Sequence, residues 1–83
     1  MSVKLDDLIS LNTLFKKINL FKGDVLLFTY DGERESKYDL KSMISRIVVT
    51  HKYNTNKFIS ATIVIKNEED TNILKSCLKE GIL

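Results

Sequence analysis

Several residue types are scarce in this chain. Among its 83 residues there is no proline, no tryptophan, one histidine (His51), one cysteine (Cys77) and three glycines. A lone cysteine forms no internal disulfide bond, which fits a reducing cytosol. One imidazole and one thiol do not make a zinc site without carboxylate help, and three glycines leave no glycine-rich phosphate-binding loop. The sequence thus predicts neither a metal site nor a cofactor.

Long apolar runs and catalytic motifs are absent as well. No stretch approaches the ~18 apolar residues that span a bilayer. Lys4, Asp6 and Asp7 interrupt the apolar core that a signal peptide would need. No G-x-S-x-G nucleophile turn occurs either. We therefore expect a cytoplasmic protein that has no membrane segment and is not an enzyme.

Acidic residues are missing from one long segment. Residues 40–66 contain no Asp or Glu, although they carry five of the thirteen Lys and Arg residues. This segment has a formal charge of +5, while the other residues, with eight Lys and Arg against eleven acids, sum to −3. Such segregation of charge favours an acidic or polyanionic partner.

What remains is the composition of one globular domain, residues 1–83, with 43% hydrophobic and 29% charged residues. A domain of this size buries only ~60–65% of the surface that its unfolded chain exposes, so it is marginally stable alone. We expect a homodimer, because self-association would add stability. The excess of lysine over arginine, eleven to two, is typical of AT-rich genomes such as those of many phages and mobile elements.

Helical spacing occurs near both ends of the chain. Residues 3–21 are predicted to form an amphipathic helix, with apolar residues at intervals of three and four: Leu5, Leu8, Leu11, Phe15 and Ile18. Gly23 would end this helix in a left-handed conformation. Asn67 would cap a second helix that begins with three acids at its positive end and carries Cys77 in its apolar stripe.

The segment between the helices favours strands. We predict a strand over 24–30, a tight turn at Asp31-Gly32 and a short polar return strand over 33–38. Residues 39–44 fit either an irregular stretch or one helical turn. Strands over 45–53 and 57–66 would follow, joined by a turn at 54–56. The predicted fold class is α+β, an antiparallel sheet of three to four strands flanked by an N-terminal and a C-terminal helix.

Alternation along these strands defines two faces. One is continuously apolar and is the predicted core, with His51 at its rim: Leu26, Phe28, Tyr30, Ile47, Val49, Ile59, Ala61, Ile63 and Ile65. The other mixes apolar, hydroxyl and basic residues: Val25, Leu27, Thr29, Arg46, Val48, Thr50, Lys52, Phe58, Ser60, Thr62 and Val64. Two helices cannot cover both faces, so the mixed face would be an exposed contact surface, unless a bulge shifts the alternation or one helix packs on each face.

The mixed face suggests a small regulatory or inhibitory binding protein that acts by macromolecular contact. The residues predicted to contact its partner are Arg46, Val48, Thr50, Lys52, Lys57, Phe58, Ser60 and Val64. A protein partner, acidic in character, is favoured because only two cations border an apolar centre.

The alternative is an RNA- or DNA-binding protein that uses the same face, with cations on phosphates and an aromatic ring on a base. The predicted order of elements resembles that of double-stranded-RNA-binding domains. That resemblance is limited to the order, since the three acids that open the last helix would repel phosphate.

Overall fold

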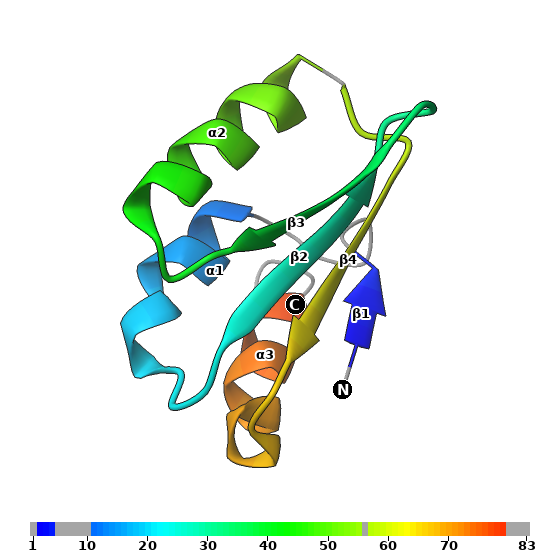
Figure 1. The fold of residues 1–83 in the computed structure, drawn as a ribbon. Helices are drawn as coiled ribbons and strands as arrows, with labels where there is room; N and C mark the ends of the chain where they lie inside the picture. The colour runs from blue at the N-terminus through cyan, green and yellow to red at the C-terminus, as the bar shows by residue number, and fades with distance from the viewer. Residues whose placement is uncertain (1, 5–10, 56, 80–83) are drawn as a thin grey trace.

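The computed structural model describes residues 2–4, 11–55 and 57–79 (Figure 1). In chain order, the elements are β1 (Ser2–Lys4), α1 (Leu11–Lys16), the 3₁₀ turn η2 (Ile18–Leu20), β2 (Val25–Tyr30), β3 (Glu35–Asp39), α2 (Met43–Asn54), β4 (Ser60–Ile65), the 3₁₀ turn η3 (Glu68–Asp70) and α3 (Thr71–Lys79). The four strands form one antiparallel sheet in the order β1-β4-β2-β3. The predicted α+β class is therefore confirmed.

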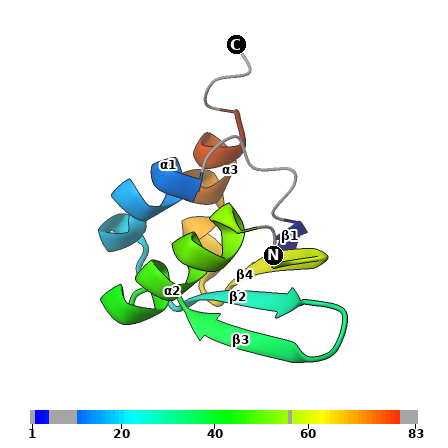
Figure 2. The ribbon, with the colours of Figure 1, turned by 90° about the horizontal axis from the view of Figure 1, so that it is seen from above.

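The three helices lie on the same side of the sheet, which leaves its other face without a covering element among the described residues (Figure 2). The covered face supplies Leu27 and Ile63, which are directly opposite each other on β2 and β4 and fully buried. The helices add Leu14, Val49 and Leu74 to the same core. Cys77 is buried there as well, as its position in the helical stripe predicts.

The predicted orientation of β2 is wrong, whereas that of β4 is right. Ala61, Ile63 and Ile65 of β4 are buried as expected, whereas Ile59, predicted on the same face, lies before the strand begins and is 70% exposed. On β2, however, the buried side chains are Val25, Leu27 and Thr29, and Leu26, Phe28 and Tyr30 lie on the open face. The alternation of β2 is uninformative because both of its faces are apolar, so only pairing with β4 decides which one is buried.

The β2–β3 hairpin forms at the predicted place, with a longer loop than Asp31-Gly32 alone. Tyr30 pairs with Glu35, so residues 31–34 make the turn. The Asp31 carboxylate accepts hydrogen bonds from the backbone N–H groups of Glu33 and Arg34, both at 2.9 Å. Gly32 has a φ of 101°, which a residue with a side chain rarely adopts.

The structure departs from the helix predicted over residues 3–21. Residues 2–4 form an edge strand that pairs with β4, with Val3 opposite Ile63. The described helical part covers Leu11–Lys16 and is followed by the 3₁₀ turn η2; residues 5–10, including Leu5 and Leu8, lie outside the described part of the chain. Gly23 is not in the left-handed region. Its role is close approach, since a Cβ there would lie 2.7 Å from Cβ of Asn67.

The strand predicted over 45–53 is a helix, α2, and this is the largest correction. Ser42 caps it through a hydrogen bond from the Ser45 N–H, and the Thr55 N–H donates to His51 at its other end. The β-branched residues 47–50 favour a strand only weakly. Packing of Val49 into the core, next to a sheet that already has four strands, outweighs that preference. In place of the turn predicted at 54–56, Asn54 ends a helix and Thr55 caps it, and residue 56 lies outside the described part of the chain.

The start of the C-terminal helix is confirmed at Asn67, whose side chain accepts a hydrogen bond from the Glu69 N–H at 2.9 Å. Asp70, one of the three acids at the positive end of this helix, also binds the backbone of a distant segment. It is fully buried, and its two carboxylate oxygens accept hydrogen bonds from the backbone N–H groups of Lys22 at 2.8 Å and Gly23 at 2.9 Å. This bond pair ties η3 to the segment that precedes β2.

Candidate functional site

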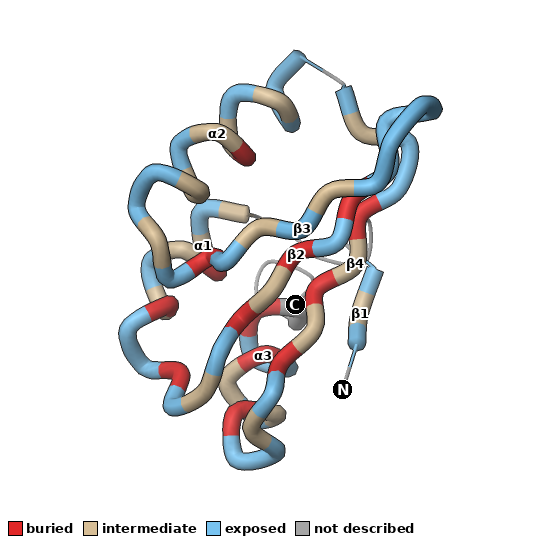
Figure 3. Tube along the Cα trace, in the orientation of Figure 1, coloured by how far each residue is buried: buried red, intermediate tan, exposed pale blue. Residues whose placement is uncertain are grey.

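Several large apolar side chains of α2 are exposed. Met43, Ile44 and Ile47 are 67%, 74% and 62% exposed, whereas Val49 is the one residue of this helix that is fully buried. Figure 3 shows the same imbalance along α2, which is exposed or half-buried over almost all of its length. An ordinary surface helix turns its large apolar side chains toward the core. In α2 three of them point to solvent instead.

A hollow lies beside this stripe, between α2 and Phe15 of α1. It has a volume of about 390 Å³, opens widely to solvent and is lined by Phe15, Met43, Arg46, Ile47, Thr50 and His51. We define the α1–α2 face as these six residues together with Ile44.

Arg46 is held in place at the edge of the hollow. Its guanidinium Nη1 donates a hydrogen bond to the Leu40 backbone oxygen at 2.7 Å. Thr50, one turn further along the same side of α2, donates through its hydroxyl to the Arg46 backbone oxygen at 2.8 Å. The polar members of the α1–α2 face are thus anchored by the fold, while its apolar members are available for contact.

The eight residues predicted to contact a partner do not form one surface. Arg46 and Thr50 line the hollow, whereas Val48 and Lys52 lie on another side of α2. The Lys52 ammonium donates to the Tyr38 hydroxyl at 3.1 Å, so this lysine links α2 to β3.

The remaining residues of that set lie elsewhere. Phe58 packs against the core with its ring 6.5 Å from that of Tyr38. Ser60 and Val64 lie on the open face of β4, and Lys57 is exposed before this strand. The predicted mixed sheet face is therefore replaced by two separate surfaces, the α1–α2 face and the open face of the sheet.

Five residues of the α1–α2 face were missed in the sequence: Phe15, Met43, Ile44, Ile47 and His51. His51 is exposed on α2 and is not at the rim of the core, as the strand interpretation had implied. One signal was present in the sequence, because the apolar residues at 40, 43, 44 and 47 have helical spacing. The β-branched residues that follow favour a strand, so the helical spacing did not lead to a predicted helix.

The fold also brings two acid-free segments together. Besides residues 40–66, residues 8–23 contain no Asp or Glu. The first supplies α2 and the second supplies α1 and η2, and both line the hollow. The described residues of α1, η2 and α2 thus include lysines, an arginine and a histidine but no acid. The excess of positive charge in residues 40–66 therefore extends over the side of the molecule formed by α1, η2 and α2.

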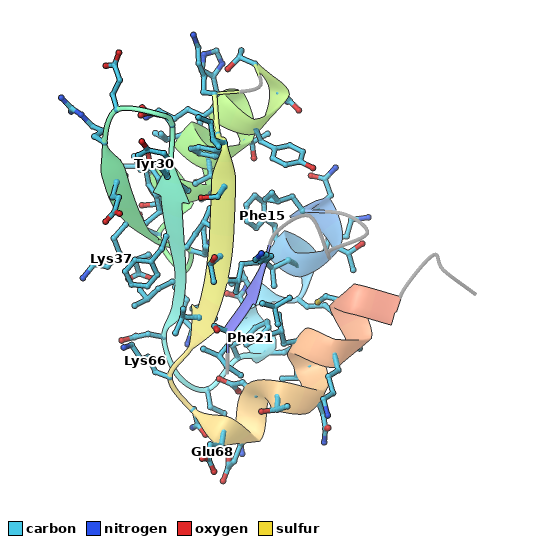
Figure 4. The ribbon with its side chains drawn as sticks, turned by 90° about the vertical axis from the view of Figure 1, so that its right-hand side faces the viewer. Phe15, Phe21, Tyr30, Lys37, Lys66 and Glu68 are labelled. Carbon is cyan, nitrogen blue, oxygen red and sulfur yellow. The ribbon has the colours of Figure 1, made fainter. Side chains whose placement is uncertain are left out.

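The open face of the sheet has a different character. Phe28 is exposed in the middle of β2 and Tyr30 at its end, and Figure 4 shows Tyr30, Lys37 and Lys66 on the side of the sheet opposite Phe15 and Phe21. Basic and acidic residues share this face. Lys37 lies opposite Phe28, and Glu35 lies opposite Tyr30.

Other chemistry is not apparent in the part of the chain that the structure describes. No three His, Cys, Asp or Glu side chains gather there as a metal site would require, and none of its helices has the length and apolarity to cross a membrane. Comparison of the chain with protein-family models, curated proteins and solved structures finds no match.

Proposed function

We propose that this protein is a small, non-enzymatic binding protein that acts by contact between its α1–α2 face and another protein. The observation that supports this most is the outward position of Met43, Ile44 and Ile47 on α2. Contiguous exposed apolar side chains with a polar border are typical of interaction sites. A compact domain of this kind acts by occupying a surface of its partner, so the proposed role is regulatory or inhibitory.

Site-specific photo-crosslinking tests this function. A benzophenone amino acid is placed at Ile47 and, as a matched control, at Lys75, which is exposed on α3. In nuclease-treated lysate we expect position 47, and not position 75, to form a covalent adduct with a protein. Substitution Ile44→Ser should reduce that adduct. Equal labelling from both positions, or none from position 47, would contradict the proposal.

A homodimer remains part of the proposal, and the open face of the sheet is its best interface. This face exposes Phe28 and Tyr30 on β2 and carries Lys37 together with Glu35 and Asp39, so a second copy can offer charges of both signs. Sedimentation at tens of micromolar should give twice the monomer mass, and Phe28→Asp should return the monomer. A monomeric wild-type protein would refute the dimer.

Nucleic-acid binding is the alternative function, and one observation favours it. A single row across the open face carries Lys4, Thr62, Phe28 and Lys37 on its four strands. An exposed ring with cations on both sides suits stacking on a base between phosphates. Glu35 and Asp39 on the same face weaken the attraction for phosphate.

This alternative predicts binding of single-stranded RNA by a monomer, with an affinity that falls steeply as salt is raised. An apolar-centred protein contact would respond little to salt. Binding of RNA that persists after Lys4→Glu and Lys37→Glu would count against the row as its site.

A further inference from the structure

We propose that the partner of the α1–α2 face is an acidic amphipathic helix, which lies along α2 and inserts its apolar side chains into the hollow beside Phe15. This inference rests on the function proposed above and specifies the chemistry of the partner.

The extent of the hollow along α2 matches two turns of a partner helix. The α2 residues that line it run from Met43 to His51, including Ile47 and Thr50. Met43 and Thr50 are seven residues apart, which corresponds to about 10 Å along a helix axis at 1.5 Å per residue. Apolar anchors at positions i, i+4 and i+7 of a partner helix span the same length.

The composition of the hollow decides against phosphate as its occupant. Three of its six lining residues, Phe15, Met43 and Ile47, are large and apolar, and Arg46 and Thr50 stand at its border with their own hydrogen bonds. A nucleic-acid backbone would leave those apolar side chains in water. The apolar side of a protein helix would cover them, at a gain of ~25 cal/mol for each Å² buried.

Charge decides between an acidic helix and a second copy of this chain. The described residues of α1, η2 and α2 contain no Asp or Glu, and their cations include Lys16 and Arg46. Lys41, which precedes α2, donates a hydrogen bond from its ammonium to the Phe21 backbone oxygen at 2.8 Å. The hydrogen bond to the Leu40 backbone oxygen occupies only some of the N–H donors of the Arg46 guanidinium, and the others can still bind a carboxylate. If a second copy of the chain docked here, its cations would repel the same cations of the first copy. Glutamates that flank the apolar anchors of a partner helix would instead pair with these cations.

Three synthetic peptides of roughly 18 residues, or five helical turns, test the inference against the full-length protein. The first has leucine at the anchor positions and glutamate on its other faces. The second replaces every glutamate by lysine, and the third keeps the glutamates and replaces the leucines by serine. Binding is followed by amide chemical shifts of the isotope-labelled protein and by fluorescence anisotropy of the labelled peptides.

We expect the acidic leucine peptide to bind and to shift resonances of α1 and α2. The lysine peptide should bind about tenfold more weakly, which is the combined effect of a few exposed ion pairs. The serine peptide should not bind.

Three protein variants give matched comparisons. Ile47→Ser should abolish binding, and Lys16→Glu should weaken it several-fold. Lys75→Glu, at an exposed position on α3, should leave it unchanged. Circular dichroism of each variant shows whether the fold is retained.

The inference is overturned if the lysine peptide binds equally well, if the shifts fall outside α1 and α2, or if no peptide binds more tightly than about 1 mM. Shifts of the same residues by a single-stranded RNA, or self-association that Ile47→Ser removes, would assign the face to those occupants instead. Peptide failure alongside a protein adduct at position 47 would reject the acidic helix but keep the proposed function. Failure of both would reject the function as well.

Discussion

Asp70 provides the sharpest test of how this fold is held together. It is fully buried, and both of its oxygens accept hydrogen bonds from backbone N–H groups, those of Lys22 at 2.8 Å and Gly23 at 2.9 Å. Substitution Asp70→Asn keeps the shape of the side chain. It replaces one acceptor oxygen by an NH₂ group, which would face one of these N–H donors.

The expected loss of stability follows from these two hydrogen bonds. A hydrogen bond to a charged group contributes about 1.5–3 kcal/mol, and a buried donor left without its acceptor costs about 1–3 kcal/mol. Asp70→Asn should therefore lower the free energy of unfolding by about 2–4 kcal/mol. That is a large share of the total for 83 residues, which is about 4–12 kcal/mol at 0.05–0.15 kcal/mol per residue.

Urea denaturation followed by circular dichroism measures this loss, and Glu69→Gln is the matched control. Glu69 neighbours Asp70 and pairs with Lys22 at 2.7 Å, but both side chains of that pair are about two-thirds exposed (68% and 65%). Its removal should cost less than about 1 kcal/mol. With a slope near 1 kcal/mol per molar urea, the midpoint of Asp70→Asn should fall by roughly 2 M or more. The role assigned to Asp70 would be refuted if the two variants had equal midpoints.

Two further predictions concern α2 and the hairpin. Val49→Ala should lower the free energy of unfolding by about 1–3 kcal/mol, since it leaves a cavity in the core. Ile47→Ala should change it by less than about 0.5 kcal/mol. Thermal or urea unfolding checks both, and equal losses would mean that α2 is oriented differently. The hydrogen bond from the Arg34 N–H, followed by that from Glu33, lowers the pKa of the exposed Asp31 carboxyl from its usual 3.8. Because the folded pKa is the lower one, the stabilisation from this turn is present above about pH 4 and is lost as pH falls through the folded pKa. Carboxyl-carbon NMR titration should show the depressed value, and a midpoint at or above 3.8 would contradict it.

Local signals located much of the fold. The strand from Val25, the turn at Asp31-Gly32, the strand that ends at Ile65 and the cap at Asn67 were all predictable. Each depends on side chains that act on their own backbone or on a short alternation of apolar residues. The helical residues 11–16 also follow their apolar spacing, although pairing with β4 draws residues 2–4 into the sheet.

The candidate site was less predictable, because it depends on contacts between distant segments. The residues of α2 were assigned to a strand, and four of the predicted contact residues then appeared to share a face with β4. In the helix they point in different directions. Lys52 contacts Tyr38, Arg46 reaches Leu40, and Ile47 between them is exposed.

By itself, the sequence determined a small α+β domain with an antiparallel sheet and a long segment free of acidic residues. The scarcity of cysteine and glycine, and the absence of acids from residues 40–66, can be read from the sequence and need no coordinates. Only the tertiary structure decided which face of β2 is buried, because both of its faces are apolar and pairing with β4 selects one. It also decided that residues 43–54 are helical, since packing of Val49 outweighs a weak strand preference. The same packing sets α2 beside α1, so two acid-free segments become one apolar face with a positive border.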